Sequence, residues 1–176
     1  SDVCSSDLDP RRKGLATEAI GLGRLLLRLL PDQPETLGLL ALMLHCEARR
    51  GARRTPAGDY VPLNEQDIAQ WSVGMISEAE QQLSAAEKAN SLGRFQLEAA
   101  IQSIHARRAF TGRTDWEAVA LLYEGLASLA PTIGTLVCRA AAVGEARGAD
   151  AGLVLLYTIP SDRSEEHTSE LQSRHN

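Results

Sequence analysis

The sequence has few aromatic residues and few cysteines. Aromatic side chains make up 4% of its 176 residues, whereas leucine, alanine, arginine and glutamate are abundant. This composition favours an all-helical protein. Outside the N-terminal stretch, the two cysteines are Cys46 and Cys138. Two cysteines form no disulfide framework and are typical of a reducing compartment, so we expect a cytoplasmic protein.

Long apolar runs and an excess of positive charge are also lacking. No apolar run approaches the roughly 18 residues that a membrane span requires, so we expect no membrane partner. Lysine and arginine number 18 against 23 aspartates and glutamates, which gives a formal net charge of −5. A protein that binds nucleic acid by itself usually carries the opposite balance, so we expect no direct binding of nucleic acid by these residues.

Polar stretches stand at both ends of the chain, SDVCSSDL at the start and RSEEHTSELQSRHN at the end. The first can be written as a DNA segment whose reverse complement encodes the beginning of the second. Such a relation is typical of a sequencing adapter read on opposite strands. We therefore interpret residues 1–8 and 163–176 as adapter artefacts and exclude them, as one excludes an expression scar. We expect residues 9–162 to be one helical domain from a longer reading frame.

The rest of the chain shows apolar residues at helical spacing, separated by short Gly- and Pro-containing connections. Helices are predicted over residues 14–30, 35–50, 65–89, 94–109, 114–129, about 132–147 and 149–157. Leu15, Leu22, Leu26 and Leu29 form the stripe of the first. The second is apolar on nearly every side, which predicts a central buried helix. Thr114 and Glu117 have the spacing of a capping box.

These elements predict an all-α fold of stacked antiparallel helix pairs, similar to a tetratricopeptide α-α superhelix. Residues 51–64 are the only long connection in it. The sequence offers little catalytic chemistry. His45 and Cys46 are adjacent on a helix, so their side chains point about 100° apart and cannot chelate together. We interpret Cys138 as a small core residue and His105 as a histidine on a helix face. We expect no enzymatic activity, no cofactor and no metal site.

One polar group of residues stands out, the arginine cluster ARRGARR (residues 48–54), which is followed one loop later by NEQDIAQW (residues 64–71). The cluster could contact phosphate or an acidic partner. Alternatively, Arg50 or Arg53 could hydrogen-bond Asp67 and Gln66 and so hold the long loop against the helices, and the apolar surroundings favour this second interpretation. The candidate residues for an interdomain contact or a structural polar network are Arg49, Arg50, Arg53, Gln66, Asp67 and Trp71.

Four segments resemble a known family. They are LLPDQPETLGLLALMLHCEARRGAR (residues 29–53), NEQDIAQW (64–71), FQLEAAIQSIHA (95–106) and TDWEAVALLYEGLASLAP (114–131). The chain resembles the C-terminal extension of those bacterial extracytoplasmic-function RNA polymerase sigma factors, of the sigma-70 family, that carry a tetratricopeptide-like helical domain. The resemblance covers nearly all of residues 9–162. The chain departs from the family at Ile68, where an arginine is usual, and at Cys138, where an asparagine is usual.

The resemblance implies a regulatory domain in transcription initiation. Promoter reading and binding of the polymerase core would belong to sigma regions upstream of this chain, so those partners would be reached only through that upstream part. The extension would contact the sigma regions and tune their activity, and we expect it to dock through the neighbourhood of Trp71 and Arg50. The alternative is a stand-alone helical-repeat module that binds a peptide or protein and has no link to transcription.

Overall fold

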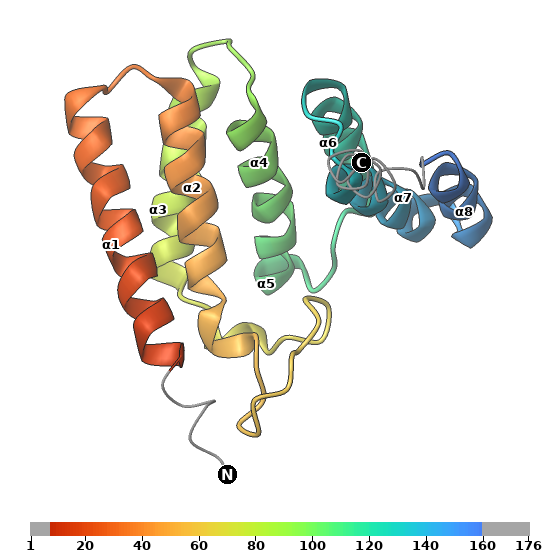
Figure 1. The fold of residues 1–176 in the computed structure, drawn as a ribbon, viewed down its shortest axis with the longest axis horizontal. Coiled ribbons are helices and arrows are strands. Elements are labelled where there is room, and N and C mark those ends of the chain that lie inside the picture. Colours follow the sequence, from red (N-terminus) through yellow and green to blue (C-terminus); the bar gives the residue numbers. More distant parts are fainter. Residues whose placement is uncertain (1–7, 160–176) are drawn as a thin grey trace, which may run out of the picture.

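A computed structural model describes residues 8–159, and the elements in that range are helical (Figure 1). Within it, the only β-type pairing is an isolated antiparallel bridge between Arg54 and Tyr60. The predicted all-α fold is therefore confirmed. Residues 1–7 and 163–176, which we interpret as adapter artefacts, lie outside the described range. The helices are α1 (Leu8–Leu29), α2 (Pro34–Ala48), η1 (Arg50–Ala52), η2 (Ile68–Gln70), α3 (Val73–Glu87), α4 (Arg94–Ala106), α5 (Arg108–Thr111), α6 (Trp116–Leu129), α7 (Ile133–Arg147) and α8 (Ala149–Tyr157).

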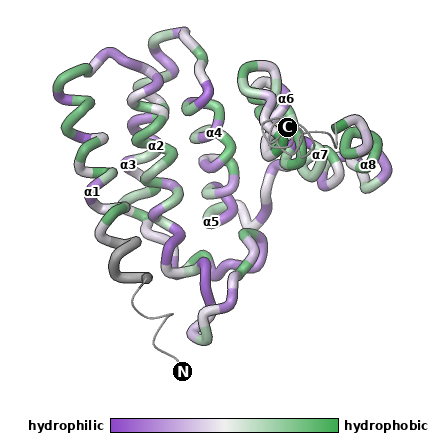
Figure 2. The backbone as a smooth tube through the Cα atoms, viewed as in Figure 1, coloured by the Kyte–Doolittle hydropathy of each residue, from purple (hydrophilic) through white to green (hydrophobic). Residues whose placement is uncertain are grey.

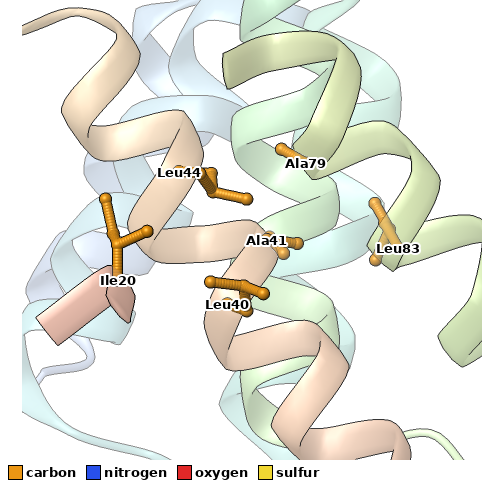
Figure 3. Packing of buried hydrophobic residues seen from close by; sticks show 7 residues of the cluster. Ile20, Leu40, Ala41, Leu44, Ala79 and Leu83 are labelled. Carbon is orange, nitrogen blue, oxygen red and sulfur yellow. The ribbon is translucent and has the colours of Figure 1, made fainter. Parts of the chain in front are cut away.

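Helices α1 to α4 form what we call the first block, with α2 at its centre. Helix α2 packs against α1, α3 and α4, as its nearly uniform apolar sequence predicts. Figure 3 shows the side chains of α2 between Ile20 of α1 and the two α3 residues Ala79 and Leu83. Small residues let the helices approach closely. A Cβ atom added at Gly38 of α2 would lie 2.7 Å from the backbone nitrogen of Gln96 in α4.

Helices α6 to α8 form a second block, which joins the first where α6 packs on α4. Its core combines Leu97 and Ile101 of α4 with apolar residues of α6 and α7. In Figure 1 the helices of the first block are seen from the side and those of the second nearer to end-on. Helices α7 and α8 touch at two glycines, since a Cβ at Gly152 would lie 2.9 Å from the Cα of Gly144.

The helix predicted over residues 14–30 is present, but α1 begins earlier, at Leu8, and most of the predicted leucine stripe faces away from α2. Leu15, Leu22 and Leu29 are 66%, 66% and 69% exposed, while Ile20 is buried and packs toward α2. Gly23 explains the choice of face. Its missing side chain leaves room for Met43 and Leu40 of α2, which would lie 2.9 and 3.2 Å from an added Cβ. Helix α1 therefore has two apolar faces, and the one with glycine packs inward.

Two predicted helix starts also differ from the structure. The helix predicted from Glu65 begins at Val73, because the hydroxyl of Ser72 accepts a hydrogen bond from the Met75 amide and caps it there. Helix α6 begins after Asp115 rather than Thr114. The Asp115 carboxylate accepts from the Ala118 amide at 3.1 Å, and Glu117, assigned to the capping box, pairs with Arg147 instead.

Candidate functional site

The segment between α2 and α3 contains most of the candidate residues. It leaves α2 through η1, turns back between Arg54 and Tyr60, and reaches α3 through η2. Figure 2 shows this segment, at the lower end of the first block, as largely hydrophilic. Three of its residues are buried, namely Ala52, Gln66 and Trp71. Trp71 is 4% exposed and packs in a small cluster with Ala48 and Ala106.

An arginine holds this segment against the helices, as the second interpretation requires, but it is Arg108 of α5. Its guanidinium donates hydrogen bonds to the backbone carbonyls of Asn64 and Gln66, the latter at 2.8 Å. The guanidinium carbon also lies 5.2 Å from the centre of the Trp71 ring, which places a cation over the aromatic face. The only sequence signal for this role is the Arg107-Arg108 pair directly after a buried helix.

The arginines that we expected to bond Asp67 and Gln66 have other partners. Arg50 forms an ion pair with Glu47 at 2.7 Å, and Arg53 donates to the backbone carbonyl of Cys46 at 2.6 Å. Asp67 accepts from the backbone amide of Ala69 and caps η2. The expected pairing of Arg50 or Arg53 with Asp67 and Gln66 is therefore wrong. The physical reason is proximity in the chain. Glu47 precedes Arg50 by three residues and Cys46 precedes Arg53 by seven, so each arginine finds an acceptor within about two helical turns.

Three of the six candidate residues nevertheless come together around a pocket of about 310 Å³. They are Arg49, Arg53 and Gln66, while Arg50, Asp67 and Trp71 lie outside its lining. Arg49 follows the end of α2 and Arg53 the end of η1, while α4 supplies one wall and α6 another. Among the residues that the structure describes, no carboxylate lines the pocket. Its lining residues are Arg49, Arg53, Tyr60, Leu63, Gln66, Gln102, His105 and Tyr123.

The pocket arginines differ in their partners from five other arginines of residues 8–159. Ion pairs with a glutamate hold Arg24, Arg50, Arg94, Arg139 and Arg147. The arginines at the pocket bond neutral oxygen atoms instead. Arg49 donates to the Gln102 side chain and to the His45 carbonyl, and Arg53 and Arg108 donate to backbone carbonyls.

This arrangement concentrates positive charge in a partly buried place. Burial is the main cause that lowers the pKa of Arg49; the interaction with Cys46 opposes it, and the charge of nearby Arg53 adds a smaller lowering. His105 is 8% exposed and responds to the same field. Burial first, then the charges of Arg49 and Arg108, lowers the pKa of His105 to about 4. His105 is therefore a neutral imidazole at pH 7, and its ring stands edge-on to Trp116 with centroids 5.4 Å apart.

Two further hollows share lining residues with this pocket, and we call the three together the groove. A second hollow of about 230 Å³ shares Leu63 and His105 with the first and adds Arg108 and Trp116. A third, of about 570 Å³, shares Trp116 with the second and is also lined by Ile104 of α4. The three hollows differ in charge. Arginines without carboxylates line the first, Glu145 joins Arg108 in the second, and the third has mixed charge, from Arg107, Arg113, Asp115, Glu117 and Glu145.

Two other residues with possible chemistry, His45 and Cys138, do not line the arginine pocket. His45 is buried, and its Nε2 lies 3.2 Å from a carboxylate oxygen of Glu80. This contact lowers the pKa of Glu80, although burial acts in the opposite direction. Cys138 is exposed, so its interpretation as a core residue is wrong. The structure places it on α7, at the rim of a hollow beside Tyr123. In the described range, no three metal-ligating side chains meet and no helix is long and apolar enough to cross a membrane.

Comparisons with known proteins give two similarities. Residues 4–87 match the model of a family described as a family of unknown function (DUF6596), a range that includes the candidate segment and ends with α3. An uncharacterised protein of Rhizobium meliloti (strain 1021) is 42% identical over 145 residues, which are 82% of this chain and 34% of that protein. The chain thus spans about a third of this relative's length. No solved structure matches the chain significantly.

Proposed function

We propose that this chain is the C-terminal regulatory domain of a bacterial RNA polymerase sigma factor. It acts in transcription initiation by contacting the promoter-reading regions of the same polypeptide. The link to transcription comes from the resemblance of the segments at residues 29–53, 64–71, 95–106 and 114–131. The polymerase core and the promoter are partners only through those upstream regions, in the cytoplasm. The domain itself catalyses no reaction and holds no cofactor.

The structural observation that supports an intramolecular contact is the outer face of α1. Leu15, Leu22 and Leu29 follow one another at seven-residue intervals, so they share one side of the helix. All three are about two-thirds exposed. An apolar end face of this kind is what a helical stack presents when a further helix packs on it, whereas a stack that ends in solvent carries polar caps. About two-thirds of the Rhizobium relative lies outside the matched region, which is ample chain to supply that helix.

This face replaces the docking site expected around Trp71 and Arg50. The Trp71 ring is buried under Arg108, and Arg50 is held by Glu47. Substitution of Trp71 would therefore disturb the fold of the long segment before it disturbed a partner. The leucines of α1 offer their side chains without any rearrangement.

The proposal is tested first by sequencing the source genomic DNA outward from both ends of the coding segment. We expect the frame to continue upstream into a polymerase-binding and promoter-reading region. A start codon directly before Asp9, with no such region, would instead leave a stand-alone helical-repeat module. The groove between the blocks favours that alternative, since a hollow lined by two helix layers suits a bound peptide.

The second test is transcription by the full-length protein with polymerase core and its promoter. The variant Leu22→Glu/Leu29→Glu places charges on the proposed contact face, and we expect transcript yield to change by about fivefold or more. Leu92→Glu/Leu121→Glu is a matched control, because these two leucines are 67% and 62% exposed elsewhere on the surface. Equal yields from the native protein and the α1 variant, with both folded, would refute docking through α1.

A further inference from the structure

We propose that the arginine pocket is a binding site for an acidic protein segment, with a glutamate or aspartate side chain entering between Arg49 and Arg53. The inference does not rest on the sigma-factor proposal, because it would hold equally for a stand-alone module. It concerns a different surface from the leucine face of α1. It follows from the partners of the arginines, from the shape of the groove and from the charge of the chain.

The arginine pocket has unused hydrogen-bonding capacity. A guanidinium has five N–H donors in a planar fork. Arg53 uses its Nη2 nitrogen to donate to the Cys46 carbonyl. Arg49 donates to the Gln102 side-chain oxygen and to the backbone carbonyl of His45. The remaining donors of both side chains belong to residues that line the hollow. A carboxylate satisfies two such donors at once and neutralises the charge, which a backbone carbonyl does not.

Within residues 8–159, no carboxylate lines this pocket. Glu47, the acidic residue nearest in sequence to Arg49, pairs with Arg50. The acidic residue nearest along the groove is Glu145, which lines the second and third hollows but not the arginine pocket. A chain with a formal net charge of −5 thus keeps an unneutralised positive pocket in a partly buried place. Holding such a pocket costs folding free energy, which a bound anion offsets.

The groove indicates a polypeptide rather than a lone small anion. The arginine pocket continues through the hollow at His105 and Arg108 to the walls formed by Trp116 and Ile104. An extended segment lying there would place an acidic side chain at Arg49 and Arg53. Its next outward-facing apolar side chain would rest near Trp116.

The test uses the purified chain and a short fluorescein-labelled peptide that alternates glutamate with leucine. Fluorescence anisotropy gives the dissociation constant, and the emission of Trp116 reports contact with the groove. We expect binding to be saturable and weakened by salt. Arg53→Gln should weaken it by about tenfold or more, since it removes a charge-assisted pair. Arg53→Lys, which keeps the charge without the fork, should retain an intermediate affinity.

Arg54→Gln is the matched control, because Arg54 neighbours Arg53 in sequence but donates to the Gly58 carbonyl and lies outside the pocket lining. Circular dichroism checks that each variant is folded. Equal losses from Arg53→Gln and Arg54→Gln would overturn the proposal. So would equal binding of a peptide with glutamine in place of glutamate, or no binding at all. If acetate or inorganic phosphate displaced the peptide at equal concentration, the ligand would be a small anion and the proposal would be wrong.

Discussion

Helices α2 and α8 have similarly apolar sequences but opposite surroundings. Helix α2 packs against α1, α3 and α4, and its Leu40 and Leu44 are almost completely buried. Helix α8 packs only on α7 among the described elements, and its Val154 and Tyr157 are 66% and 86% exposed. Apolar composition therefore does not by itself decide burial. The position in the stack does, because each helix can be covered only by its neighbours.

The comparison extends to the two blocks. The first block has a buried centre and two outer layers, so most of its apolar area is removed from water. The second block is a single row in which α6, α7 and α8 each touch the next. Hydrophobic stabilisation scales with the apolar area that is buried, so the first block should supply most of the stability. The outer faces of α1 and α8, at opposite ends of the stack, keep apolar side chains available for contact.

The largest difference between the blocks should appear in the free energy of unfolding when one leucine is truncated in each. Leu44→Ala in α2 removes a fully buried side chain and should lower the free energy of unfolding by about 2–5 kcal/mol. Leu155→Ala in α8 removes a side chain that is only partly buried against the second core, so roughly 1 kcal/mol is expected. Urea unfolding followed by circular dichroism measures both. Equal losses would show that the two blocks contribute equally.

A smaller loss of stability is expected at the junction of the blocks when the pH is lowered. The pKa of His105 is lowered to about 4 in the folded chain, against 6.5 for an unperturbed histidine, through burial and the charges of Arg49 and Arg108. The folded state thus disfavours the protonated ring. The contribution of the neutral ring to stability is complete above pH 6.5 and is lost as the pH falls from 6.5 toward 4, by about 3 kcal/mol in all.

The measurement compares unfolding of the native chain and of His105→Gln at pH 7.5 and pH 4.5. The native chain should lose more stability than the variant over this interval. Because the ring contacts Trp116 across the junction, tryptophan emission should change in the same interval. Carboxylates with lowered pKa, such as Glu80, lose their contribution mainly below pH 4.5, so they add little here. Parallel losses in the two proteins would contradict the assignment.

Sequence patterns predicted the helices well where a breaker marks their ends. Pro131 and Gly148 separate α6, α7 and α8, and the predicted bounds at Leu129 and Arg147 agree with the structure. Sequence patterns failed where two faces of one helix carry apolar residues at the same spacing. Both faces of α1 are apolar, and spacing alone cannot tell that the face with Gly23 packs inward. The start of α3 was missed because the apolar pattern begins before the capping residue Ser72.

The candidate site was predictable as a region but not in its contacts. The sequence singled out the arginines and the segment that crosses them, and Arg49, Arg53 and Gln66 do meet at one pocket. It missed Arg108, because that side chain bonds backbone carbonyls 42 and 44 positions away, and any residue type supplies a carbonyl. It also missed His105 and Tyr123 as lining residues, since packing of α4 on α2 brings the first to the arginines and packing of α6 on α4 brings the second.

The smallest change in the free energy of unfolding is expected at the N-terminal caps of the helices. Helices α6 and α7 are capped locally, by Asp115 and Thr132. Helix α4 begins at a glycine cap without a side chain, and Glu35 of α2 reaches across to accept from the Phe95 and Gln96 amides at 3.0 and 3.2 Å. Glu35→Gln removes a charge that favours the start of α4, so unfolding should become easier by about 1 kcal/mol.

Asp115→Asn is the control for this substitution, because asparagine caps a helix nearly as well as aspartate and only a few tenths of a kcal/mol should be lost. Thermal unfolding of both variants beside the native chain gives the comparison. A larger loss from Glu35→Gln would mean that the first block gains stability from a cap shared between two helices. Identical losses would mean that the contact between α2 and α4 rests on apolar packing alone. The difference between the blocks would then lie only in the number of sides that each helix has covered.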